Sequence, residues 1–243
     1  MSDLPEKKDR IQFLDAARGI CVVLMVIHHF LLDLVEILGA PEWLFTNPVF
    51  DILHYIFAGG FIFISGISSK LSRSNIKRGI KVLVIAMLIT LVTWMLDSII
   101  LFGVLHLLGT CMLLYGLTRK VWDSLDRRLA PVLYVLLLVI SALIVHACNS
   151  GAFRPDWLWP LGVKPEGFFS ADYFPIFPWV FVFLAGTWAS DFVIQRKLPA
   201  GLYTLNVPFF PEVGRRALLI YVIHQPVLYG ITYAIGYLSG ILV

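Results

Sequence analysis

Charged side chains and cysteines are scarce in this chain, and their scarcity limits what the protein can be. Only 14% of the 243 residues are Asp, Glu, Lys or Arg, against about 25% in an ordinary soluble domain. Three cysteines, Cys21, Cys111 and Cys148, are too few and too scattered for a disulfide framework. The composition is instead 59% apolar, with a mean hydropathy of +0.84. That balance excludes disorder and a soluble globule, because an interior of this size cannot hide so much apolar surface.

Alternation of apolar and polar residues with period two is also missing, so a transmembrane β-barrel is not expected. The apolar runs are continuous and about 20 residues long, which is the length of a helix that crosses a bilayer. The sequence therefore predicts an all-α integral membrane protein, a bundle of about seven transmembrane helices forming a single domain over residues 1–243. The expected spans are 11–38, 48–69, 79–96, 99–117, 130–148, 174–194 and 216–243.

The net charge of +3 says little, but the positions of the basic residues predict the orientation of the chain. Seventeen of the 19 Lys and Arg lie near the start of the chain or in and beside alternate connections between spans, and only Arg154 and Lys164 fall on the other side. By the positive-inside rule the N-terminus is cytoplasmic and the C-terminus outside. The long outer segment 149–172 is rich in aromatic residues, which is typical either of an interfacial belt or of a lid over an acceptor site.

Five of the six histidines fall well within predicted spans, where ionisable groups are costly and usually line a wet cavity: His28, His29, His54, His106 and His224. His146 lies near the outer end of its span. On the first helix Asp15, Arg18, His29 and Asp33 share one face, with Arg18 and His29 separated by roughly 16 Å of helix. His29, His106 and His224 have similar expected depths, so they are candidate catalytic groups in which a neutral imidazole acts as general base. Ordinary packing of these histidines is the alternative.

The same sequence bears on three other functions: a retinal protein, a haem protein and a transporter. The last span contains no Lys, which excludes a retinal Schiff base, while a haem held between helices stays open. A transporter for a small polar or anionic solute shares the polar cavity but predicts no affinity for coenzyme A. No metal site and no nucleic-acid partner are expected.

Several motifs, in order along nearly the whole chain, give the sequence a recognisable pattern. In that order they resemble the bacterial branch of the heparan-α-glucosaminide N-acetyltransferase catalytic-domain family, which belongs to a wider group of transmembrane acyltransferases. The motifs are residues 10–19, 25–30, 61–68, 103–109, 171–179, 183–186 and 214–226.

The resemblance implies an acyltransferase that moves an acetyl group from cytosolic acetyl-CoA to an amine or hydroxyl of an acceptor on the outer face, a sugar or glycan. It implies acetyl-CoA as co-substrate, with no metal or haem, in a bacterial plasma membrane, and it leaves a homo-oligomer open. Catalysis is expected at His29, assisted by His106 or His224, either by direct attack or through an acetyl-histidine. The expected co-substrate residues are Arg18, Asp15 and Arg216, and the expected acceptor-side residues are His54, Asp51, Asp172 and Gln225.

Overall fold

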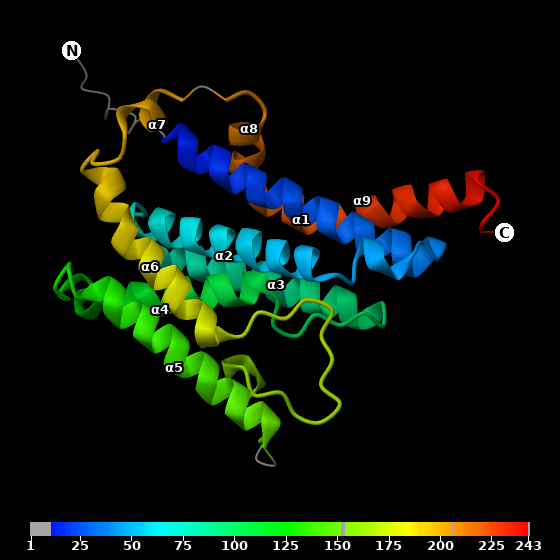
Figure 1. The fold of residues 1–243 in the computed structure, drawn as a ribbon, viewed down its shortest axis with the longest axis horizontal. Helices are drawn as coiled ribbons and strands as arrows, with labels where there is room; N and C mark the ends of the chain where they lie inside the picture. Colours follow the sequence, from blue (N-terminus) through cyan, green and yellow to red (C-terminus); the bar gives the residue numbers. More distant parts are fainter. Residues whose placement is uncertain (1–10, 152–153, 206, 243) are drawn as a thin grey trace. The chain divides into compact units, whose positions relative to one another are not determined.

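The structure is a computed structural model that describes residues 11–151, 154–205 and 207–242. Every regular element in this part of the chain is a helix, which confirms the predicted fold class (Figure 1). The basic residues Lys7, Lys8 and Arg10, used above to predict orientation, lie outside the described residues. The long helices are α1 (Gln12–Leu38), α2 (Pro48–Lys70), α3 (Asn75–Met95), α4 (Val104–Asp123), α5 (Ala130–Ser150), α6 (Ile176–Ile194) and α9 (Ala217–Leu238). The short ones are η1 (Glu42–Leu44), η2 (Trp159–Leu161), α7 (Ala200–Thr204) and α8 (Phe210–Arg215).

Within the described residues, six helices are long and apolar enough to cross a membrane, close to the predicted seven. The seventh long helix, α4, has 20 residues but carries Arg119, Lys120 and Asp123 in its last turns, which lower its hydropathy. Its start also differs from the prediction. Residues 99–103 are not helical, because Ile99 and Phe102 offer their carbonyl groups to the backbone of the loop before α6.

The last helix is shorter than predicted. It ends at Leu238, and Gly240 then adopts a left-handed φ of 70°. The backbone N–H groups of Ile241 and Leu242 both return to the carbonyl of Gly236, which closes the helix end. α3, by contrast, begins four residues before the predicted 79, because the side chain of Ser74 caps the N–H of Lys77.

The described chain divides into two compact units. Unit 1 comprises the chain up to Phe61 and from Arg196 onward, and unit 2 comprises Ile62–Gln195, so α2 is shared between them. In unit 1, α1 packs against both α8 and α9 (Figure 1). The backbones of α1 and α8 touch, because Gly19 and Gly214 have no side chains to hold them apart.

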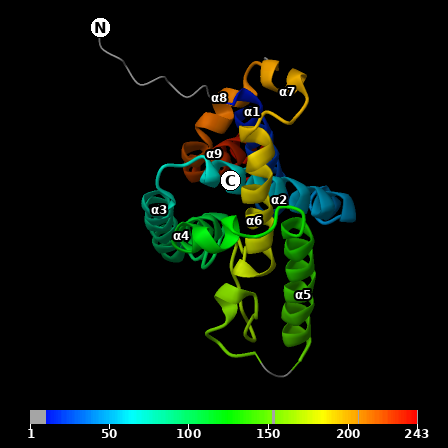
Figure 2. The same ribbon diagram turned by 90° about the vertical axis from the view of Figure 1, so that its left-hand side faces the viewer.

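Unit 2 is built from two antiparallel helix pairs, α3 with α4 and α5 with α6, and α4 also contacts α6 (Figure 2). At one end of this unit the ammonium group of Lys70 lies 3.3 Å from Asp123 and 3.0 Å from Asp191, joining the ends of α2, α4 and α6. The prediction that the whole chain is a single domain is not tested by this division and stays a prediction.

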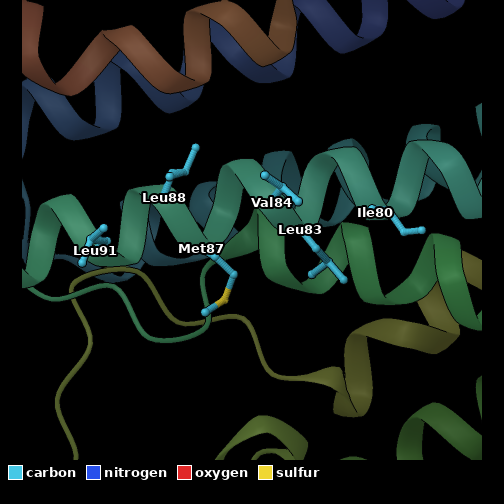
Figure 3. A pocket seen from close by; sticks show the side chains of 6 residues that line it. All are labelled: Ile80, Leu83, Val84, Met87, Leu88 and Leu91. Carbon is cyan, nitrogen blue, oxygen red and sulfur yellow. The ribbon is translucent and has the colours of Figure 1, made fainter.

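The outward faces of the long helices are apolar, as a bilayer requires. The clearest case is a shallow hollow on α3, shown in Figure 3. Its lining is entirely apolar: Ile80, Leu83, Val84, Met87, Leu88 and Leu91. Met87 is 60% exposed and Leu88 is 56% exposed in the isolated chain. Such a surface is matched by lipid tails and not by water.

Candidate functional site

Two of the predicted catalytic histidines meet in unit 1. His29 of α1 and His224 of α9 lie with their ring centroids 5.0 Å apart. The Nδ1 of His224 lies 2.7 Å from the backbone carbonyl oxygen of Tyr221, one turn earlier in α9. A carbonyl has no hydrogen to donate, so Nδ1 carries the proton and the lone pair of the neutral ring lies on Nε2. The hydrogen bond thus fixes the tautomer that a general base needs.

A second histidine pair lies beside the first in the same unit. The Nε2 of His28 is 3.1 Å from the Nδ1 of His54, so one ring donates a hydrogen bond to the other. The ring of His28 is also 5.9 Å from that of His29, which makes the four rings a continuous series from α2 through α1 to α9. Asp51 lies one helical turn before His54, exposed in the first turn of α2.

Gln225, predicted on the acceptor side, has a partner that the sequence did not indicate. Its side-chain Nε2 donates to the Oδ1 of Asp33 over 2.8 Å. Asp33 is completely buried, and it lies one turn beyond His29 on the same face of α1. A buried carboxyl group thus lies one helical turn from His29.

The predicted co-substrate residues gather at the other end of α1. Arg18 donates to Asp15 over 2.8 Å, and this pair is largely buried. The backbone of Asp15 adjoins Gly214 of α8, two residues before Arg216. A guanidinium has five N–H donors in a fixed fork, which suits it to a phosphate as well as to a carboxylate.

Arg216 is more open than Arg18. It is 66% exposed and bonds Glu212 at 2.9 Å, and Arg215 bonds the same carboxylate. The hydrogen bond from Arg215 holds the pKa of Glu212 below its usual value. Glu212 therefore stays ionised, and it holds both arginines at the junction of α8 and α9.

His106 and Asp172 both support the start of α4 in unit 2. The Nδ1 of His106 accepts from the backbone N–H of Gly103 at 3.2 Å, and its Nε2 lies 3.2 Å from the hydroxyl of Thr90. That hydroxyl donates its own hydrogen to a carbonyl, so it accepts from Nε2 and both ring nitrogens are engaged. Asp172 caps the same helix by accepting from the N–H of Val104 at 3.1 Å.

The structure thus brings together most of the predicted residues of unit 1. His29, His224, His54 and Gln225 lie near the C-terminal half of α1, and the basic residues lie near its start. The predicted role of His106 beside His29 stays a prediction. Sequence reasoning left two residues without a role, His28 and Asp33. The position of Asp33 on the same helix face as Arg18 and His29 was a signal in the sequence. Nothing in the sequence indicated its hydrogen bond to Gln225, 192 residues away.

Within the described part of the chain, no three His, Cys, Asp or Glu side chains are arranged to hold a metal ion. The groups that the arrangement brings together are a pair of imidazole rings, His29 and His224, and the buried carboxyl group of Asp33. The guanidinium of Arg18 lies about three helical turns before His29 on α1.

Comparison with known proteins gives one match. The model of a family described as "Heparan-alpha-glucosaminide N-acetyltransferase, catalytic" matches residues 10–226. Neither the search of curated proteins nor the search of solved structures finds a match. The matched segment contains all of α1 and the start of α9, and so both His29 and His224.

Proposed function

The chain belongs to the heparan-alpha-glucosaminide N-acetyltransferase catalytic family. We propose that it transfers an acetyl group from a donor on one side of the membrane to an acceptor on the other side. Acetyl-CoA on the cytoplasmic side is the donor. An amine or hydroxyl of a sugar or glycan on the outer side is the acceptor. The observation that carries this proposal is the contact of His29 on α1 with His224 on α9, together with Arg18 near the start of α1.

The donor binds along α1. Arg18 and the exposed Arg216 take the phosphates of coenzyme A, since a guanidinium binds phosphate through two parallel charge-assisted hydrogen bonds. The rise of roughly 16 Å from Arg18 to His29 is comparable to the reach of an extended pantetheine arm. The thioester then lies near the histidine pair.

The acceptor enters from the C-terminal end of α1. His29 removes a proton from its amine or hydroxyl, which attacks the acetyl carbon. The new C–N or C–O bond forms as the C–S bond breaks, and coenzyme A leaves as the thiol. His224 supports this step, because the carbonyl of Tyr221 holds the proton of its ring on Nδ1 and so leaves Nε2 as the basic nitrogen.

Binding of acetyl-CoA tests the donor side. Purified protein in detergent should bind acetyl-CoA more tightly than unrelated nucleotides, and Arg18→Gln should weaken binding about tenfold or more, as expected for loss of a charged hydrogen bond. Arg154→Gln, at an exposed arginine of the long loop, is the matched control and should bind normally. Absence of acetyl-CoA binding by the native protein would refute the proposal in favour of a transporter.

Transfer tests the histidine pair. His29→Ala should abolish acetyl transfer while the protein still binds acetyl-CoA and keeps its helical content. His146→Ala removes an exposed histidine at the end of α5, and it should leave transfer unchanged. Normal turnover by His29→Ala would show that another group is the base.

A further inference from the structure

Three buried oxygen atoms between α1 and α9 have no hydrogen-bond donor. They are Oδ2 of Asp33, the side-chain oxygen of Gln225 and the hydroxyl oxygen of Thr232. Asp33 and Thr232 are both 0% exposed. The single bond in the group runs from the amide nitrogen of Gln225 to the other carboxylate oxygen, over 2.8 Å. Asp33 and Gln225 therefore face each other, and each has an acceptor atom left over.

Within the described residues, no Lys or Arg forms an ion pair with Asp33, so a carboxylate ion in this position has no balancing charge. α9 contains no Lys or Arg, and the arginine of α1, Arg18, is about four turns away. The titratable groups around the pair are His29, Glu36, His224 and Tyr229, and none of them is a permanent cation. An unpaired buried charge costs several kcal/mol, so the neutral acid is the favoured form of Asp33.

Addition of one proton to Asp33 removes the unbalanced charge and also supplies a missing hydrogen-bond donor. Protonation turns Oδ2 of Asp33 from an acceptor into a donor. The oxygen of Gln225 is a buried acceptor that lacks a donor, on the side chain whose amide nitrogen already bonds the other carboxyl oxygen of Asp33. The acid and the amide then hold each other through two hydrogen bonds, one in each direction.

We propose that Asp33 and Gln225 form a proton site that relays the proton of an ammonium acceptor from His29 to the C-terminal end of α1. This relay role rests on the proposed function. An ammonium acceptor must lose one proton before it attacks. The acetyl carbon then gains the nitrogen and loses the sulfur, and a second amine proton goes to the thiolate. One proton per turnover is left over, whereas a hydroxyl acceptor leaves none.

The relay follows one face of α1. His29, Asp33 and Glu36 are spaced by four and three residues, so they lie on one stripe, with neighbouring side chains about 5–6 Å apart at their Cβ atoms. Burial falls along this stripe, from the fully buried Asp33 to the exposed Glu36. As His29 passes its proton on, Asp33 gives up its own towards Glu36. Asp33 is thus a positioning and relay residue and does not touch the reacting atoms.

Infrared difference spectroscopy of the whole protein in detergent tests the proton site without any need for activity. The native protein at neutral pH should show the C=O stretch of a protonated carboxyl group, and Asp33→Asn should lack it. Gln225→Met should move the band to higher frequency, because the acid loses its hydrogen bonds. Glu36→Gln is the control and should leave the band unchanged. A spectrum in which Asp33→Asn removes only carboxylate bands refutes the proton site.

Turnover of acetyl-CoA with glucosamine as probe acceptor tests the relay. Asp33→Asn should lower kcat about tenfold or more, with KM for acetyl-CoA unchanged, and added imidazole should restore part of the rate by carrying the proton. A purely structural role would not respond to imidazole, so a slow variant without rescue refutes the relay, as does native kcat. If the native protein shows the band but transfers no acetyl group, the proposed function and the relay fail together and the proton site stands.

Discussion

The contact between α1 and α8 gives the sharpest test of how unit 1 is packed. Gly19 and Gly214 face each other there, and each packs on the backbone of the other helix. A methyl group on Gly19 would lie 2.9 Å from the carbonyl carbon of Phe210 and 3.0 Å from the nitrogen of Gly214, and closer still to the oxygen of Phe210. We therefore expect Gly19→Ala to force the two helices apart.

The size of the effect follows from those distances. Ordinary contact begins at 3.4 Å, so the carbonyl carbon alone requires a shift of 0.5 Å (3.4 − 2.9), and the oxygen requires more. The obstacles are backbone atoms, which cannot rotate away as a side chain does. Overpacking of this kind costs about 1–3 kcal/mol. Backbone obstacles place the cost in the upper half of that range. Inside a helix, alanine returns roughly 0.5–1 kcal/mol relative to glycine, so the net loss should be about 1–2.5 kcal/mol.

Thermal unfolding in detergent, together with acetyl-CoA binding, measures this loss. Gly230→Ala is the matched control, because it lies inside α9 with nothing within 4 Å of the added carbon, and it should be neutral or stabilising. The double variant of Gly19 and Gly214 should cost less than the sum of the single variants, since one displacement relieves both clashes. If Gly19→Ala unfolds at the same temperature as Gly230→Ala, the close approach of α1 and α8 is wrong.

Three further predictions concern unit 2. Burial raises the pKa of Tyr173 to about 12. The contribution of this side chain to stability is therefore complete below 10.0, its pKa in the unfolded chain, and is lost as pH rises towards 12. Melting curves recorded over a series of pH values should show that Tyr173→Phe removes this alkaline loss. Asp172→Ala should cost about 1 kcal/mol through the uncapped start of α4, seen as faster hydrogen exchange there and contradicted by unchanged exchange. Lys70→Met leaves Asp123 and Asp191 facing each other, so it should lower the melting temperature, and adding Asp191→Asn should recover part of the loss; no recovery would show that the ion network is unimportant.

The helices and the polar stripe of α1 could be predicted from the sequence, because both depend on local periodicity. Continuous apolar runs require helices in a bilayer, and the spacing of Arg18, His29 and Asp33 puts them on one face of any helix. The predicted end of α9 and the predicted start of α4 differ from the structure. Apolar residues continue past both boundaries, while a left-handed glycine and loop hydrogen bonds stop the helix.

The partners of the site residues could not be predicted from the sequence. Gln225 bonds Asp33 across 192 residues, and His28 bonds His54 across 26. Such pairs depend on how helices pack, which hydropathy does not encode. His106 shows the same limit, since only the structure reveals that Gly103 and Thr90 engage both nitrogens of its ring.

Arg18 and His29 lie on a single unbroken helix, α1, so the distance between them can take only widely spaced values. Inserting one residue between Arg18 and His29 would turn His29 by about 100° and lengthen the helix by only about 1.5 Å. The two groups return to the same face only after three or four residues, a step of about 5.4 Å. The distance between them can therefore change only by whole turns. If the proposed donor binds along α1, a donor with a slightly longer or shorter arm has no intermediate register to occupy.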